Sequence, residues 1–315
     1  MSEQPAFLKL EPTYRDYVWG GDRLRPGYVP TAEAWVVWEG DQIANGPLAG
    51  QTLKDVAAQY GVKLLGTKAV RATGERFPLL IKLLDCEQWL SLQVHPDDAL
   101  AAELHGPGEF GKTEAWHILD ALPDAKLILG IDPEISQGAL SDLIRNGEIK
   151  HHLQSVKAQS GETIFMPAGT IHALGPGLLI YEVQQTSNWT YRLYDWDRPA
   201  TPERPLHLEE SARAAQVNSE ARVKAPPETA NGSRHELITC QYFTLELLSA
   251  QTDPIALDTA GETFHAVTVI AGQARLTTDN EQIELGQFET ALVSANTGAY
   301  RFEPLKDCRA LKASL

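Results

Sequence analysis

Short apolar runs separated by turn residues dominate the chain and predict a mainly β protein. They occur throughout residues 32–196, and similar runs resume after residue 234. Runs of this length, bounded by glycine, proline and polar residues, are typical of strands in antiparallel β structures. The runs in the first part of the chain are AEAWVVWEG, FPLLIKLLD, WLSLQVHPDD, KTEAWHILD, AKLILGID, GETIFMPAG, GLLIYEVQQ and TYRLYDW.

Helical patterns are few and short. Residues 52–60 predict a capped helix, with Thr52 as the N-cap and Asp55 at the third helical position. Residues 133–153 have apolar positions at helical spacing, but their glycines favour two short helices over one long helix. Residues 207–217 are a third helical candidate.

The length of 315 residues suggests two domains. Residues 217–234 are polar, rich in proline, glycine and alanine, and without periodicity, which predicts a linker or a long crossover. We therefore expect one domain over residues 1–230, with inserted helices around 133–153, and a second β domain over 231–315. The second domain offers no candidate site, and a shared Gly-Glu-Thr unit, at Gly161 and Gly261, would suit a duplication with one degenerate copy.

The charge balance argues against several classes of partner. The chain has 27 basic and 42 acidic residues, a formal charge of −15. A chain this acidic is a poor candidate for binding nucleic acid or an anionic membrane, and no apolar run approaches the length of a membrane span. The N-terminus lacks a signal-peptide layout, and the three cysteines form no disulfide or zinc motif, so we expect a cytoplasmic protein.

Four side chains form the strongest candidate site. Gln93 and His95 are two positions apart on a predicted strand and therefore point to the same face. Glu114 and His172 follow on later strands. One amide oxygen, two imidazoles and one carboxylate suit a borderline divalent metal with an open coordination position. The alternative is that both histidines are hydrogen-bonded core residues and that Glu114 is a surface acid, but the joint pattern favours ligands.

The surroundings of His172 resemble the second sequence motif of cupins. The spacing is Gly161-x5-Pro167-x-Gly169-x2-His172, which describes a strand, a tight turn and an imidazole presented by the next strand. This resemblance implies cupin domains, that is, jelly-roll β-barrels, with a few short helices. It also implies that the second β domain is a degenerate, metal-free cupin-like domain.

Five motifs in order resemble type I mannose-6-phosphate isomerase, a zinc-dependent cupin family, in its short bacterial form. They are LLIKLLD, LSLQVHPDD, GKTEAWHIL, FMPAGTIHAL and YEVQQTSNWTYRLYDWDR. The resemblance implies interconversion of D-mannose 6-phosphate and D-fructose 6-phosphate by proton transfer through an enediol. It implies one Zn²⁺ per chain, with the ligands Gln93, His95, Glu114 and His172.

The same resemblance implies roles for six further residues. Arg192 matches the catalytic arginine, Glu182 a candidate base and Lys112 an active-site lysine, although a zinc-bound water is a rival base. Substrate phosphate contacts fall on Ser91, Lys82 and Arg198, where Arg198 stands in place of a frequent lysine. These cations would supply the local positive charge that an acidic protein needs to bind a sugar phosphate.

Two other functions stay open. The first is a different enzyme on the same scaffold, either an isomerase of another, unphosphorylated sugar or an iron-dependent dioxygenase. The second is a sugar-binding cupin without catalysis, which Arg192 and Glu182 argue against, because a binder needs neither a base nor an open metal. The sequence does not indicate an oligomeric state.

Overall fold

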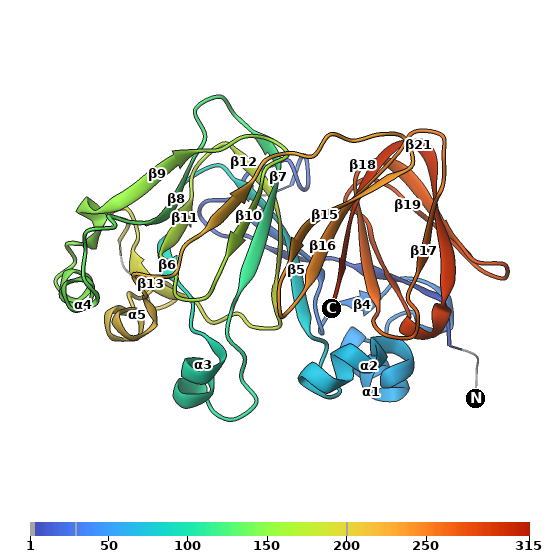
Figure 1. The fold of residues 1–315 in the computed structure, drawn as a ribbon, viewed down its shortest axis with the longest axis horizontal. Helices are drawn as coiled ribbons and strands as arrows, with labels where there is room; N and C mark the ends of the chain where they lie inside the picture. Colours follow the sequence, from blue (N-terminus) through green and yellow to red (C-terminus); the bar gives the residue numbers. More distant parts are fainter. Residues whose placement is uncertain (1–3, 29, 200) are drawn as a thin grey trace. The chain divides into compact units, whose positions relative to one another are not determined.

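The computed structural model describes residues 4–28, 30–199 and 201–315, and the chain forms two compact units (Figure 1). Both units are discontinuous: unit 1 takes residues 1–13, 35–82 and 227–315, and unit 2 takes 14–34 and 83–226. The sequence suggested one boundary near residue 230, which is close to the last of these crossings. The earlier crossings arise because N-terminal segments pair with C-terminal strands inside unit 1.

The seven-stranded sheet carries one wall of unit 2. Its order is β14-β10-β7-β12-β5-β3-β2, and the unit boundaries fall within β2, β3 and β5. The strands are β2 (Thr13–Arg15), β3 (Glu33–Val37), β5 (Leu79–Cys86), β7 (Glu114–Ala121), β10 (Thr163–Met166), β12 (Leu178–Gln185) and β14 (Arg222–Lys224).

A five-stranded sheet forms the other wall of unit 2. Its order is β13-β6-β11-β8-β9, and all its pairings are antiparallel. The strands are β6 (Leu92–Val94), β8 (Lys126–Ile131), β9 (Leu153–Lys157), β11 (His172–Leu174) and β13 (Tyr191–Tyr194).

The two sheets of unit 2 share one apolar cluster, to which Trp116 and Ile164 come from the first sheet and Leu127 and Leu174 from the second. The opposite face of the five-stranded sheet is covered by short helices, through a second cluster. Because strand side chains alternate, Gln93, His172 and Arg192 face away from the covering helices, as Leu174 does. The second cluster includes Leu92, Val94, Ala173, Tyr191 and Leu193 from the sheet, and Leu140, Ile144 and Ala212 from the helices.

The short helices predicted from the sequence are confirmed. Thr52 caps α1 (Leu53–Tyr60), and its side chain accepts from the Asp55 backbone N–H at 3.2 Å. Residues 133–153 form α4 (Gln137–Arg145) and the 3₁₀ turn η2 (Ile149–His151), and the third candidate becomes α5 (Leu208–Ala214).

Two helices were missed in the sequence, α2 (Val62–Thr73) and α3 (Asp98–His105). A break at Gly66, with φ 87°, interrupts the periodicity of α2. A Cβ at Gly66 would lie 2.4 Å from the Glu262 carbonyl oxygen, so this close approach needs glycine. The helix α3 has a readable cap at Asp97, but it is short and follows a strand-like run.

A nine-stranded sheet forms unit 1. Its order is β15-β16-β21-β18-β20-β1-β4, with β17 on β21 and β19 on β18. Its interior is mainly apolar, but it includes buried polar pairs, among them Glu246 with Lys312 and His265 with Tyr300. The strands are β1 (Phe7–Glu11), β4 (Gln42–Ile43), β15 (Ser233–Thr239), β16 (Thr244–Ala250), β17 (Ile255–Asp258), β18 (His265–Thr277), β19 (Gln282–Leu285), β20 (Thr290–Val293) and β21 (Ala299–Ser314).

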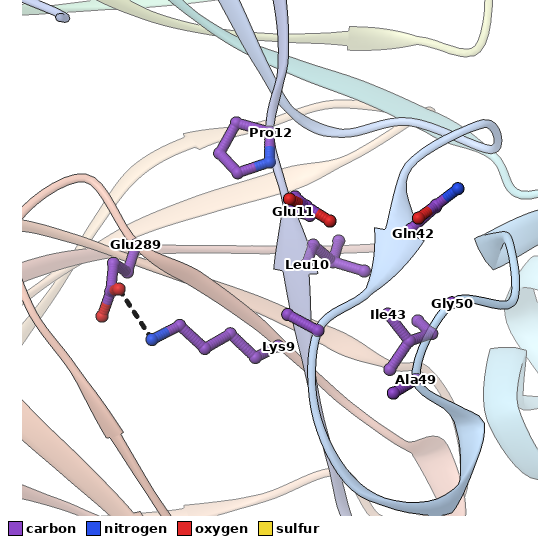
Figure 2. Close-up of a pocket in the computed structure, with 10 residues that line it drawn as sticks. Lys9, Leu10, Glu11, Pro12, Gln42, Ile43, Ala49, Gly50 and Glu289 are labelled. Carbon is purple, nitrogen blue, oxygen red and sulfur yellow. Dashed lines mark ion pairs between the residues drawn. The ribbon is translucent and has the colours of Figure 1, made fainter.

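A hollow of about 470 Å³ lies beside β1 and β4 in unit 1 (Figure 2). An ion pair of 2.6 Å joins Lys9 to Glu289 at its side, and the lining also includes Glu11 and Gln42. Within the described part of the chain, no helix is long and apolar enough to cross a membrane.

Candidate metal centre

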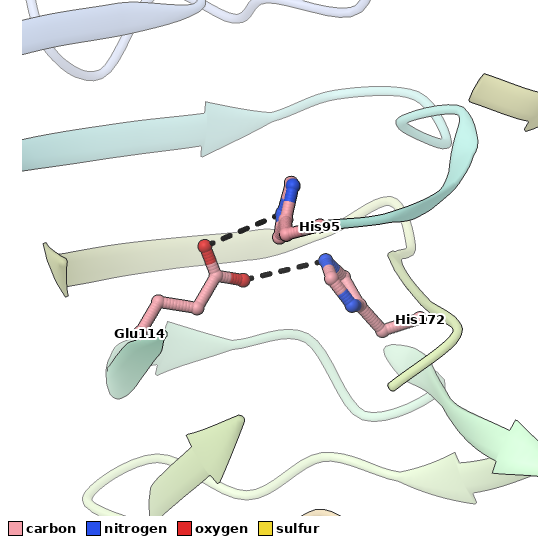
Figure 3. A group of neighbouring side chains, drawn as sticks. All are labelled: His95, Glu114 and His172. Atoms are coloured by element: carbon pink, nitrogen blue, oxygen red, sulfur yellow. Dashed lines mark ion pairs between the residues drawn. The ribbon is translucent and has the colours of Figure 1, made fainter. Parts of the chain in front are cut away.

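His95, Glu114 and His172 converge in unit 2 with their ligand atoms within 4.8 Å of one another (Figure 3). His95 follows directly after β6, Glu114 opens β7 and His172 opens β11, and all three are buried. Figure 3 shows the Glu114 carboxylate reaching both imidazoles. One carboxylate oxygen lies 3.5 Å from His95 Nε2 and the other 3.3 Å from His172 Nε2.

Backbone carbonyls fix how both imidazoles carry their protons. His95 Nδ1 lies 3.0 Å from the Trp189 oxygen, and His172 Nδ1 lies 2.9 Å from the Thr170 oxygen. A carbonyl only accepts, so each Nδ1 is the N–H and donates. Burial, followed by the charge of Lys112, lowers the pKa of His172 to about 3, so this imidazole is neutral.

This arrangement fits a cation. The Nε2 lone pair of the neutral His172 points toward a carboxylate oxygen of Glu114, and His95 Nε2 lies near the other oxygen. A divalent metal is bound by such atoms, neutral imidazole nitrogens and a carboxylate oxygen, with a second partner fixing each Nδ1. The donor chemistry of the three residues therefore matches a metal centre.

Lys112 and Glu182 lie against this cluster. The Lys112 ammonium is 3.1 Å from His95 Nε2 and 3.3 Å from a Glu182 oxygen, and it also donates to Glu114. Glu182 lies opposite Trp116, two positions from the Glu114–Gln184 pair, so both acids share one face of the paired strands β7 and β12. Two acids and one ammonium thus lie together in a buried place, which is unusual without a function.

Gln93 and Arg192 lie on the opposite sheet, in one row with a candidate ligand. Backbone pairing sets His172 beside Gln93 and Gln93 beside Arg192. The Arg192 guanidinium donates to the Pro205 carbonyl oxygen at 2.9 Å, and its Nε has no hydrogen-bond partner among the described residues. Burial, then Arg204, lowers the Arg192 pKa from its ordinary value.

Three arginines gather near Asp195 at the end of β13. Arg198 and Arg204 donate to its carboxylate at 3.0 and 2.8 Å, and their charges also act on Arg192. Burial would raise the Asp195 pKa, but the hydrogen bonds and charges of Arg204 and Arg198 hold it below its ordinary value. The sequence pattern did not predict Arg204 as part of the site. The single acid leaves this group of three guanidinium ions with a net positive charge.

The two remaining predicted phosphate contacts are buried. Ser91 lies just before β6 in unit 2. Lys82 lies in β5, and its ammonium is 5.4 Å from the centre of the Trp35 ring. Lys82 belongs to unit 1, so its role beside a substrate phosphate stays a prediction.

Several residues that hold the site together were not predicted from the sequence. Gln185 accepts from the Thr113 backbone N–H and donates to Asp98, each at 2.9 Å, and so ties the start of β7 to α3. Trp189 and Thr170 act on the histidines through backbone carbonyls. A backbone contact leaves no residue-type signal, although both residues lie inside the motifs quoted above.

Comparison with known proteins identifies the family. Residues 7–111 match the family model described as the catalytic domain of type I phosphomannose isomerase. Mannose-6-phosphate isomerase ManA of Bacillus subtilis is 33% identical, over 98% of both chains. The chain belongs to the type I phosphomannose isomerase family. As a member of that family it is an aldose–ketose isomerase.

Solved structures of phosphomannose isomerases have the same fold. A crystal structure of the mannose 6-phosphate isomerase from Bacillus subtilis matches with a TM-score of 0.86 and 28% identity, over 99% of this chain and 100% of that one. A zinc-bound mannose 6-phosphate isomerase matches with a TM-score of 0.76 over 98% and 99%. At 17% identity, the second match establishes the fold alone.

Proposed function

We propose that this chain interconverts D-mannose 6-phosphate and D-fructose 6-phosphate with one Zn²⁺ bound by Gln93, His95, Glu114 and His172. The observation that carries this proposal is the convergence of His95, Glu114 and His172, whose ligand atoms lie within 4.8 Å of one another. Family membership supports the reaction, and the donor set supports the metal, because zinc accepts imidazole nitrogen and carboxylate oxygen. When bound, zinc polarises a substrate oxygen and favours loss of the neighbouring carbon-bound proton.

Glu182 is proposed as the base. Isomerisation moves a proton between the adjacent carbons C2 and C1 through an enediol, so one group can remove the proton and return it. Glu182 is buried, and one of its carboxylate oxygens lies 3.3 Å from the Lys112 ammonium. Lys112, which also contacts Glu114, would hold both acids in a fixed orientation.

Arg192 is proposed to stabilise the negative charge that develops on the enediol oxygen. A guanidinium stays protonated near neutral pH, even where burial lowers its pKa. The backbone row that joins Arg192, Gln93 and His172 supports a position near the metal. A preorganised charge of this kind contributes to the rate because it needs no reorientation during the reaction.

Binding of the phosphate is assigned to Ser91, Lys82 and Arg198. Arg198 is held by Asp195 and by the Trp89 carbonyl oxygen, at 2.6 Å, so its guanidinium is ordered before substrate arrives. The arginines around Asp195 supply local positive charge in a chain of net charge −15. Such a local field is what a phosphate dianion requires here.

The two units are proposed to have different roles. Unit 2 would be the catalytic cupin domain, and the C-terminal strands of unit 1 a degenerate cupin-like domain without metal. No disulfide joins Cys86, Cys240 and Cys308 in the described part of the chain, and the expected location is the cytoplasm. The expected partner is a small sugar phosphate, with neither nucleic acid nor a membrane.

A coupled assay tests the proposed function. Mannose 6-phosphate is converted by the purified protein and the fructose 6-phosphate formed is measured, before chelation, after chelation and after addition of zinc. We expect activity that disappears with chelator and returns with zinc. Activity on free mannose alone would point to a different sugar isomerase, and binding of fructose 6-phosphate without turnover would point to a sugar-binding protein.

A further inference from the structure

The Trp189 backbone carbonyl is the contact that orients His95. Its oxygen accepts from His95 Nδ1 at 3.0 Å, so the imidazole is oriented with Nε2 toward Glu114. Trp189 belongs to a loop between β12 and β13, and a loop carbonyl keeps a fixed direction only when its residue is held. The structure shows what holds it.

His105 clamps Trp189 from the end of α3. The imidazole and the indole are stacked, with ring centres 3.4 Å apart and planes inclined by 3°. His105 Nε2 also lies 2.8 Å from the Tyr191 hydroxyl. Burial raises the pKa of Tyr191 to about 12, so the phenol keeps its proton and stays a neutral hydrogen-bond partner of His105. One imidazole therefore holds the two residues on either side of Thr190.

Glu109 also holds the Trp189 side chain. The indole N–H of Trp189 donates to the Glu109 carboxylate at 3.0 Å. His105 and Glu109 both belong to the chain segment between the candidate ligands His95 and Glu114. The segment between His95 and Glu114 thus contacts Trp189, and the Trp189 carbonyl in turn orients His95.

We propose that His105 and Glu109 are positioning residues: they hold Trp189 so that its carbonyl keeps His95 in the Nδ1–H form with Nε2 toward the metal. This role rests on the metal site proposed above. His105 acts in addition on Tyr191, the neighbour of the proposed catalytic Arg192, so the same clamp aligns a ligand and a catalytic side chain. Partners of this kind behind a metal-bound histidine typically change metal affinity by about 10–100-fold.

The test compares His105→Ala and Trp189→Ala with His105→Phe, which retains an aromatic ring for stacking. For each protein, the transfer of zinc to a chelator gives the affinity, and nitrogen NMR of labelled histidines in the metal-free protein gives the tautomer of His95. We expect both alanine variants to bind zinc about 10-fold or more weakly and to show a mixture of His95 tautomers. His105→Phe should stay close to wild type in zinc affinity, and His151→Ala, which removes an exposed imidazole, should change neither quantity.

The outcomes separate this inference from the proposed function. Unchanged zinc affinity and an unchanged His95 tautomer in folded His105→Ala and Trp189→Ala would overturn the positioning role, whatever the activity. A wild-type protein that binds zinc but does not convert mannose 6-phosphate would overturn the proposed function and leave the positioning role intact. If an alanine variant fails to fold, Trp189→Phe is the deciding variant, because it retains the stack on His105 but loses the hydrogen bond to Glu109. An unchanged His95 tautomer and an unchanged zinc affinity in Trp189→Phe would contradict the role of Glu109.

Discussion

The Glu114 carboxylate oxygen Oε1 lies 3.3 Å from His172 Nε2, and the imidazole proton is held on Nδ1 by the Thr170 carbonyl. Two acceptors at this distance repel unless a cation lies between them. We therefore predict that Glu114→Gln and His172→Ala weaken zinc affinity strongly. The loss should exceed the about 10–100-fold that is typical when a residue hydrogen-bonded to a ligand is removed. Zinc content after dialysis measures this. Glu209→Gln, an exposed change in the same unit, should retain the metal, and full zinc occupancy in His172→Ala would remove this residue from the ligand set.

Replacement of Arg192 by alanine should leave zinc content unchanged and lower kcat by roughly 100-fold or more, as loss of one charge-stabilising donor does in other enzymes. The reason is that the guanidinium acts on the charge formed during the reaction and not on the metal. Arg192→Lys should recover only part of the rate, because a point charge does not reproduce the planar donor group. The matched control is Arg213→Ala, which removes a surface arginine paired with Glu103. Wild-type turnover in metal-loaded Arg192→Ala would contradict the assigned role.

Glu182→Gln should abolish exchange of the substrate C2 proton with solvent while zinc remains bound. The amide is nearly the same size as the carboxylate and can still contact Lys112, which lies 3.3 Å from Glu182, but it cannot accept a proton at neutral pH. The measurement is uptake of deuterium at C2 in heavy water. If the variant exchanged this proton at the wild-type rate, a different group would be the base.

The sequence predicted the strand-rich architecture and the gathering of His95, Glu114 and His172 because both depend on side-chain type and spacing. Alternation along β6, β11 and β13 is visible as a pattern, and so is the turn before His172. The Trp189 carbonyl was not predictable in this way, since any residue has a carbonyl and only the fold decides where it points.

The discontinuous units were not predictable for a related reason. Residues Phe7–Lys9 pair with Ala291–Val293, and the residue types in either segment do not indicate which strand the other will be. The apolar pattern of β1 indicates a strand but not the sheet to which it belongs. Arg204 was missed because a surface-type residue in a proline-rich loop becomes part of a site only through contact with Asp195.

Glu246 and Lys312 form a buried ion pair in unit 1, and the removal of one partner should be costly. Glu246 also accepts from Arg234, while Lys312 is nearly inaccessible. We expect Glu246→Leu to lower the free energy of unfolding by about 3–5 kcal/mol, because Lys312 keeps a buried charge without its acid. The double variant Glu246→Leu with Lys312→Met should recover most of the loss. Denaturant unfolding of the single and double variants tests this; equal losses in both would show that the acid matters for another reason.

His265 should make the stability of the protein depend on pH. Burial, then the charges of Lys312 and Arg234, lowers its pKa to about 3, and its Nδ1 lies 2.7 Å from the Tyr300 hydroxyl, whose own pKa burial raises. The unfolded chain binds this proton near pH 6.5 and the folded chain does not, so stability falls as the pH drops from about 6.5 toward 3. The slope from one such group is about 1.4 kcal/mol per pH unit. Between pH 6.5 and 4.5, the free energy of unfolding of His265→Gln should therefore fall by about 2–3 kcal/mol less than that of the wild type. Carboxylates that titrate in the same range cancel in this comparison, and His235→Ala, at a less buried position of the same unit, should keep the wild-type slope. Parallel unfolding curves for wild type and His265→Gln would show that this imidazole is protonated as readily in the folded protein as in the unfolded chain.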